Sequence, residues 1–186
     1  MLDSHNQHAV IHGLKDGRRD AWTALYDGYS ADVWRFVGRL VGGSTADVAD
    51  VVQETFLAAA RTARQFDPER GTLWSWSTGI AHHQAAAYWR QSGKTDRLRT
   101  LAGVGAIDAR QWWDGTESAD DFWQRQELAE LVRGVLAELS ADYSALLTAK
   151  YLDEQSLDEM SVRFGGSVEA IKSKLARARQ IGRAHV

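Results

Sequence analysis

The stretch Asp47-Val48-Ala49-Asp50-Val51-Val52-Gln53-Glu54-Thr55-Phe56 decides how this chain is organised. On a helix of 3.6 residues per turn, its apolar side chains share one face with the alanines that follow, namely Val48, Val51, Val52, Phe56, Ala59, Ala60 and Ala63. The other face carries Asp47, Asp50, Gln53, Glu54 and Arg61. A purely structural helix rarely needs so one-sided a surface. The pattern therefore predicts a docking face, with a solvated surface charged for solubility as the alternative.

The composition is that of an ordinary soluble globular protein. The chain has 186 residues, of which 44% are hydrophobic and 25% charged. No run approaches the roughly 18 apolar residues that a membrane span requires. The first twelve residues lack the basic and apolar blocks of a signal peptide, so we expect a cytoplasmic protein. Zero cysteines exclude disulfides, thiolate zinc sites and thiol catalysis.

The charge is distributed unevenly along the chain. The net charge is −3, yet residues 161–186 hold six lysines and arginines against Glu169 alone. Residues 114–121 hold four acids, which are Asp114, Glu117, Asp120 and Asp121, and no base. A basic end that follows an acidic segment indicates a polyanionic partner.

The periodicity of apolar residues predicts an all-α protein. We expect helices at about 6–14, 20–40, 47–66, 73–91, 121–139, 141–152, 157–164 and 168–181. Residues 93–121 have scattered glycines and no sustained period, which indicates an irregular linker. We expect Trp112 and Trp113 in this linker to pack on the protein's own domains. The predicted architecture is two small helical domains, at 1–92 and 122–186, joined by the linker at 93–121.

Capping residues mark several helix starts. Ser44 with Asp47 resembles a capping box, Thr72 is a good N-cap, and Ser156 with Glu159 is a full capping box. Ser167 is the expected N-cap of the last helix. A short helix, the turn at Gly165-Gly166 and a longer basic helix together predict a helix-turn-helix unit.

Two groups of motifs resemble a known family. The segment 50–56, the loop Phe66-Asp67-Pro68-Glu69-Arg70-Gly71, Trp76 and Ile80-Ala81 resemble region 2 of a bacterial RNA polymerase sigma factor. Leu157-Asp158-Glu159-Met160, Gly165, Ser167-Val168 and the segment 171–179 resemble region 4. With no region 1.1 and no folded region 3, the layout is similar to the extracytoplasmic-function (ECF) group of the sigma-70 family.

The resemblance implies a subunit that binds core RNA polymerase and directs promoter recognition and melting. It implies docking on the clamp helices of the polymerase through Asp47, Asp50, Gln53 and Glu54, since carboxylates suit arginine partners. It also implies promoter DNA and an anti-sigma factor as further partners. By the same layout, the linker would enter the RNA exit path, where its acids would mimic RNA phosphates.

The resemblance also implies that the loop at 66–72 and the helix after it capture the melted −10 element of the promoter, by stacking bases and holding phosphates. The candidate residues are Arg70, Trp74, His82, His83, Tyr88, Trp89 and Arg90. We assign Trp76 to the core, and leave Trp74 as a stacking platform or additional core. His82-His83 departs from the family pattern, which leaves the −10 sequence undefined. Adjacent histidines point about 100° apart on a helix and no third ligand is evident, so no metal site is expected.

The last helix would lie in the major groove of the −35 element. The candidate residues are Ser167, Glu169, Ala170, Lys172, Ser173, Lys174, Arg177 and Arg179, the two arginines as phosphate contacts. Leu157, Met160, Ile171 and Leu175 are predicted to be core.

Two other classes of function compete with this interpretation. One is a stand-alone two-domain helix-turn-helix regulator that never joins the polymerase. The other is an enzyme, for which the six histidines offer no nucleophile or carboxylate pair at helical spacing, so we expect no catalytic residues. We also expect no cofactor, no small-molecule substrate and no direct membrane insertion.

Overall fold

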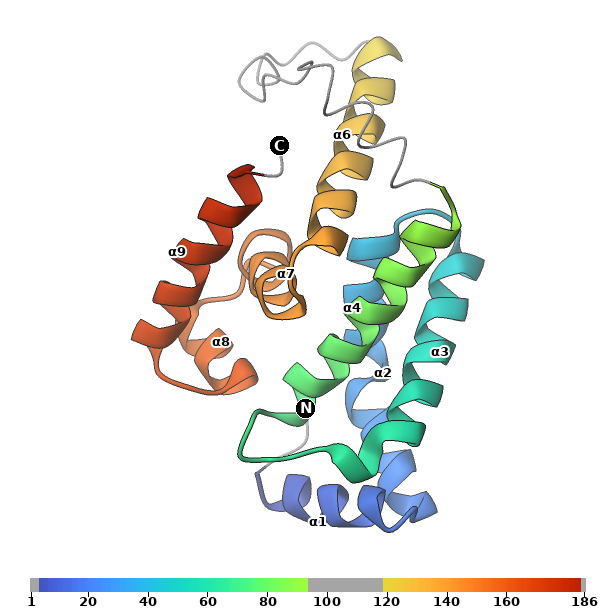
Figure 1. Cartoon of the computed structure of the whole chain (residues 1–186), viewed down its shortest axis with the longest axis vertical. Helices are drawn as coiled ribbons and strands as arrows, with labels where there is room; N and C mark the ends of the chain where they lie inside the picture. The colour runs from blue at the N-terminus through green and yellow to red at the C-terminus, as the bar shows by residue number, and fades with distance from the viewer. Residues whose placement is uncertain (1–3, 94–118, 185–186) are drawn as a thin grey trace.

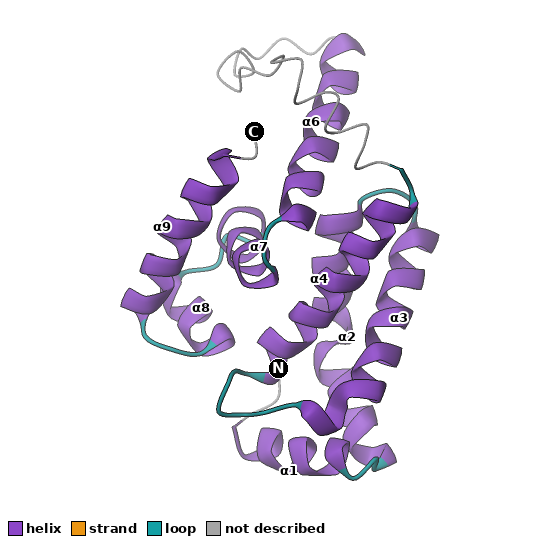
Figure 2. Cartoon of the chain, viewed as in Figure 1, coloured by secondary structure: helices purple, strands orange, loops and turns teal. Residues whose placement is uncertain are grey.

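The computed structural model describes residues 4–93 and 119–184, and over this part of the chain the fold is all-α, as predicted (Figures 1 and 2). Its α-helices are α1 (Ser4–Lys15), α2 (Arg19–Val41), α3 (Thr45–Thr62), α4 (Leu73–Gln91), α6 (Ala119–Glu138), α7 (Ala141–Leu147), α8 (Leu157–Phe164) and α9 (Val168–Ala184). A 3-10 turn (Ala63–Gln65) extends α3. The predictions for Trp112, Trp113 and the linker acids lie outside the residues whose side chains the structure describes.

The helix predicted at 141–152 is continuous over that range but changes its geometry partway along. After α7 the backbone widens into a π-helical turn (Thr148–Leu152). The amide of Asp153 donates to the Thr148 carbonyl at 3.0 Å, and the amide of Gln155 to the Ala149 carbonyl at 2.9 Å. Glu154 then takes a positive φ of 54°, which ends the helical path and turns the chain toward α8.

The predicted caps are confirmed. The Ser156 hydroxyl accepts from the Glu159 amide at 3.2 Å, and the Glu159 carboxylate accepts from the Ser156 amide at 2.7 Å. Ser44 and Asp47 form the same reciprocal pair at the start of α3. Thr72 and Ser167 accept from backbone amides at the starts of α4 and α9. Local chemistry therefore sets where these helices begin.

Helices α1 to α4 surround the larger core. Leu25, Val33 and Leu40 of α2 are fully buried, and α3 covers them with Val48, Val51, Val52, Thr55 and Ala59. The predicted apolar face of α3 needs one correction, because Ala60 is exposed while Thr55 is buried. Thr55 is tolerated inside since its hydroxyl donates to the Val51 carbonyl at 2.7 Å.

A smaller core lies between α7, α8 and α9. Met160, Ile171 and Leu175 are buried there, with the partly buried Leu157 packed against them, as predicted. Leu146 and Ala149 supply the remaining buried surface. The helix-turn-helix unit therefore has its own apolar centre.

The two units pack against each other. Helix α4 contacts α2 and α3 and also contacts α6, α7 and α8, so it lies between the larger core and the helix-turn-helix unit (Figure 1). Leu136, Leu139 and Ala145 join the larger core from α6, α7 and the turn between them. We call the contact of α6–α8 with α2 and α4 the seam. Among the described helices, none is long and apolar enough to cross a membrane.

Candidate protein and nucleic-acid interface

The outer face of α3 is open to solvent. Asp50, Gln53 and Glu54 are exposed. Asp47 differs, since its carboxylate turns back to accept from the amide and hydroxyl of Ser44 at 3.3 and 3.0 Å. Within the predicted docking set, Asp47 is therefore occupied as a helix cap, while the other three side chains are presented outward.

Sequence reasoning missed an apolar member of this face. Leu57 is 41% exposed and stands three and four residues after Glu54 and Gln53, so it shares their side of the helix. An apolar side chain beside carboxylates is typical of a protein interface, where apolar contact adds to polar positioning. The same 3.6-residue period that located the acids would have located Leu57.

The candidate −10 residues divide into two groups. Arg70, His83 and Arg90 are exposed, and Tyr88 is half-buried. The remaining three are almost fully buried, at 4% exposure for Trp74, 7% for His82 and 3% for Trp89. In this conformation only the first group can reach a nucleic acid.

Trp89 is a core residue in this structure, which differs from its prediction as a DNA contact. Its Nε1 atom donates to the carbonyl of Leu40 at 2.9 Å. Leu40 lies in the last turn of α2, where carbonyls lack helical partners, so the indole satisfies an otherwise unpaired acceptor. This hydrogen bond joins α4 to the end of α2.

Trp74 and His82 are buried partly by the other unit. Tyr29 and Phe36 of α2 pack on the Trp74 ring with centroids 6.2 and 6.4 Å away, and the guanidinium of Arg163 lies 3.8 Å from its centroid. The Nε2 atom of His82 lies 3.1 Å from the Leu136 carbonyl oxygen. Burial lowers the pKa of His82, and the Leu136 carbonyl opposes that shift only in part.

Trp76 occupies the place expected of it. Its ring lies 5.2 Å from that of Phe66, and it packs on the larger core while partly exposed. Pairing of these two aromatic rings holds the loop containing Pro68 against the start of α4.

The exposed face of α9 is basic. It carries Lys172, Lys174, Arg177 and Arg179, while Ile171, Leu175 and Ala178 face the small core. The candidates Ser167, Glu169, Ala170 and Ser173 are also exposed. The Lys172 ammonium lies 2.8 Å from the Glu169 carboxylate. Either side chain would have to leave this ion pair to contact DNA.

The sequence did not predict the ion pairs of the seam. Arg163 of α8 lies 2.8 Å from Asp32 of α2, and Arg39 lies 3.5 Å from Asp153 and donates to the Leu152 carbonyl at 3.1 Å. Partners more than a hundred positions apart leave no periodic signal. Only the packing of the two units brings them together.

Comparison with known families agrees with this geometry. The family "Sigma-70 region 2" matches residues 25–95, and "Sigma-70, region 4" matches residues 129–181. The first match spans most of α2 together with α3 and α4, and the second spans the second half of α6, all of α7 and α8, and most of α9. The chain belongs to the sigma-70 family and has the two-region layout of its ECF group.

Similar proteins extend over almost the whole chain. The ECF RNA polymerase sigma-E factors of Salmonella typhimurium (strain LT2) and Escherichia coli (strain K12) are each 25% identical, covering 97% of this chain and 94% of the relative. That of Haemophilus influenzae is 24% identical, covering 97% and 95%. A solved structure of CnrH in complex with the cytosolic domain of CnrY has a similar fold, with a TM-score of 0.50, 21% identity and coverage of 96% and 95%.

Proposed function

We propose that this chain is a dissociable promoter-specificity subunit of bacterial RNA polymerase, acting in the cytoplasm and without catalysis of its own. One observation carries the proposal. A single chain presents an exposed acidic helix face on α3 and an exposed basic recognition helix, α9, on two units of the same sigma family. A protein that bridges a polymerase and a promoter needs both surfaces.

The α3 face is the proposed polymerase contact. Asp50 and Glu54 would pair with arginines of the clamp helices, Gln53 would accept or donate beside them, and Leu57 would add apolar contact. Bidentate pairing of a carboxylate with a guanidinium fixes orientation as well as affinity. This suits a subunit that must hold DNA at a defined distance from the active centre.

The DNA contacts are proposed for α4 and α9. At the −35 element, the base edges would be contacted by Glu169, Lys172, Ser173 and Lys174 of α9. The phosphates would be held by Arg177 and Arg179. At the −10 element, phosphates or bases would be held by the exposed Arg70, just before α4, and by His83 and Arg90 on α4. Trp74 would add a base-stacking platform to this surface, and because it is buried it would become accessible only when the seam opens.

A protein inhibitor is the third proposed partner. The structurally similar CnrH is solved with the cytosolic domain of CnrY, a second protein. We propose that this chain is likewise held by an anti-sigma factor until a signal releases it.

The test is promoter-dependent transcription with reconstituted holoenzyme. Asp50→Lys with Glu54→Lys should abolish binding to core polymerase and the run-off transcript. The two substitutions turn two negative charges on the docking face into positive ones, which would repel the arginines of the partner. Glu127→Lys with Asp142→Lys is the matched control, since both acids are exposed on α6 and α7 and the charge change is equal. If the α3 variant bound core polymerase like the control, a regulator that works apart from the polymerase would be favoured instead.

A further inference from the structure

Arg163 makes three different contacts across the seam. Its Nη2 atom lies 2.8 Å from the Asp32 carboxylate, and its guanidinium carbon lies 3.8 Å from the centroid of the Trp74 ring. Its carbonyl oxygen accepts from the Thr72 hydroxyl at 2.9 Å. These contacts fix α8, the first helix of the helix-turn-helix unit, to α2 and to the start of α4.

The contact with Trp74 covers the ring that a base would need. Trp74 is 4% exposed, with Tyr29 and Phe36 on it from α2 and Arg163 on it from α8. A guanidinium and a nucleic-acid base are both attracted to the face of an indole. They cannot share the same position over it.

We propose that Arg163 is an intramolecular latch that masks the −10 surface of the free chain by occupying the Trp74 ring, and that single-stranded promoter DNA takes its place when the seam opens. The inference deepens the proposed function and rests on it, because it assigns Trp74 as the base-stacking platform of that function. The latch itself is a property of the free chain.

The seam is built with polar groups that remain unpaired. Among the described residues, Trp74 Nε1 and Arg163 Nε are buried without a hydrogen-bond partner. Burial also lowers the pKa of Arg163, against the opposing effect of Asp32, so the charged guanidinium is held there at a cost. A contact with unpaired buried donors favours an equilibrium between closed and open forms over a permanent interface.

Closure affects the two DNA-binding surfaces unequally. The basic face of α9 stays exposed while Trp74 and His82 of α4 are covered. Opening must also break the Arg39–Asp153 pair and the His82–Leu136 contact, and it must expose Leu136, Leu139 and Ala145 from the larger core. Residues 92–118 separate α4 from α6, and a chain of that length can span roughly 90 Å when extended, so the covalent connection permits separation.

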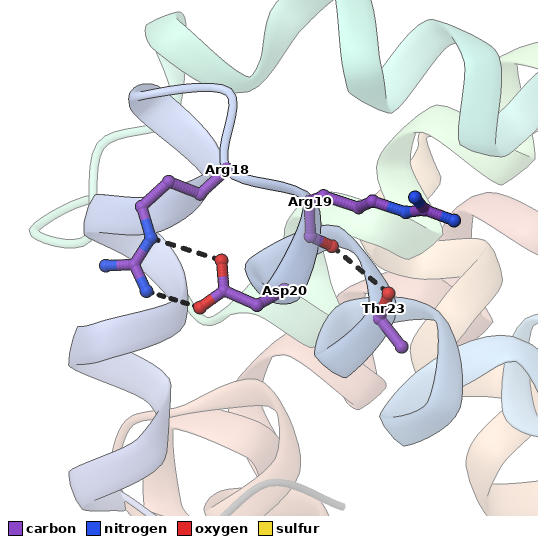
Figure 3. Close-up of polar contacts among 4 residues, drawn as sticks. All are labelled: Arg18, Arg19, Asp20 and Thr23. Carbon is purple, nitrogen blue, oxygen red and sulfur yellow. Dashed lines mark hydrogen bonds and ion pairs between the residues drawn. The ribbon is translucent and has the colours of Figure 1, made fainter.

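A second arginine–aspartate pair provides a matched control. Arg18 is paired with Asp20, with its Nε atom donating to Asp20 Oδ1 at 3.1 Å, and both side chains are exposed (Figure 3). This pair lies within one unit, at the start of α2. Arg18→Ala and Asp20→Asn therefore change charge like Arg163→Ala and Asp32→Asn without touching the seam.

The first measurement is small-angle X-ray scattering of the full chain. The wild type and both control variants should share one radius of gyration, somewhat above the about 16 Å of a fully compact chain of this length because a minority of molecules is open. Arg163→Ala and Asp32→Asn should expand it, with helical content by circular dichroism unchanged. Asp32→Asn keeps α8 and its arginine intact, so it tests the latch even if Arg163→Ala perturbs the helix-turn-helix unit.

The second measurement is binding of the full chain to a fluorescent pool of single-stranded oligonucleotides with randomised centres. Removing a cation normally weakens binding to DNA. The latch predicts instead that Arg163→Ala binds the oligonucleotides about 3- to 10-fold more tightly than Arg18→Ala. This factor is expected if roughly 10–30% of the wild-type chain is open, because only open molecules bind through Trp74.

The outcomes separate the latch from the proposed function. Unchanged scattering in both seam variants would overturn the latch, as would expansion without tighter binding. Expansion with tighter binding supports it. If the seam variants behave as predicted but no variant gives a core-dependent transcript, the proposed polymerase function fails while the latch on a DNA-binding surface stands.

Discussion

The Nε2 atom of His82 lies 3.1 Å from the carbonyl oxygen of Leu136, which joins α4 to the end of α6 across the seam. His82 is 7% exposed, and burial lowers the pKa of its imidazole below the ordinary value of 6.5. The neutral ring therefore predominates in the folded chain at pH 7, where its Nε2–H can donate to the carbonyl.

The stability of the fold should consequently fall in mild acid. Because the pKa of His82 is lower in the folded chain than in the unfolded one, the unfolded chain binds the extra proton first. The stabilisation is complete above about pH 6.5 and is lost as the pH falls toward the lowered pKa of the folded form. Urea midpoints measured from pH 8 to pH 5 should decrease below pH 6.5.

His82→Gln should flatten that pH dependence, since glutamine retains a donor for the Leu136 carbonyl and does not titrate. The exposed neighbour offers the control, and His83→Gln should leave the wild-type profile in place. Equal profiles for the two variants would assign the acid sensitivity to other groups.

Trp89→Phe should destabilise the chain by at least about 1–3 kcal/mol, because the buried Leu40 carbonyl loses its donor and the smaller ring leaves part of the indole volume unfilled. For a chain of this size that corresponds to a melting temperature lower by roughly 2–4 °C per kcal/mol. Thermal unfolding followed by circular dichroism measures the change. Arg90→Ala, on the exposed side of the same helix, should leave the melting temperature within about 1 °C.

How much the sequence could predict depends on how far apart the interacting residues are. The starts of α3, α4, α8 and α9 were predictable because Ser44, Thr72, Ser156 and Ser167 act on amides three residues away. The faces of α3 and α9 were predictable because burial on a helix follows its period. The rule misplaced two residues of α3, because Ala60 is exposed and Thr55 is buried. Thr55 can be buried because its hydroxyl donates to a carbonyl of its own helix.

The seam could not be predicted by such rules. Trp74 and Trp89 are both aromatic and both buried, and their spacing on α4 does not show which groups bury them. The structure places the Arg163 guanidinium on the Trp74 ring and the Leu40 carbonyl at the Trp89 indole nitrogen. The pairing of Arg163 with Asp32 depends on how α8 packs against α2. The sequence predicted the helices of each unit but not the residues through which the two units contact each other.

The capping box of α8 should contribute measurably to stability. Ser156→Ala removes the acceptor of the Glu159 amide at the start of the helix, which should cost about 1 kcal/mol. Ser173→Ala is the control, because Ser173 is exposed on α9 and away from a helix start. Chemical denaturation should show a lower midpoint for the first variant alone, and equal midpoints would mean that solvent replaces the cap.

The basic face of α9 should make DNA binding depend on salt. Arg177 is exposed and lies on the face opposite the buried Ile171 and Leu175, which suits a phosphate contact. Arg177→Ala should weaken holoenzyme binding to all promoters by a similar factor. It should also reduce the slope of log K against log salt by about 1, because one phosphate contact is lost.

A base-reading residue should behave differently. Glu169 lies about two turns before Arg177 on α9. Glu169→Gln should change the ranking of −35 sequences in a competition binding assay, since a carboxylate accepts from the cytosine amino group and an amide prefers adenine. The same substitution releases Lys172 from its 2.8 Å pair, so the salt slope should stay the same or rise. If Arg177→Ala changed the sequence ranking and Glu169→Gln only the salt slope, the assignment of phosphate and base contacts on this helix would be reversed.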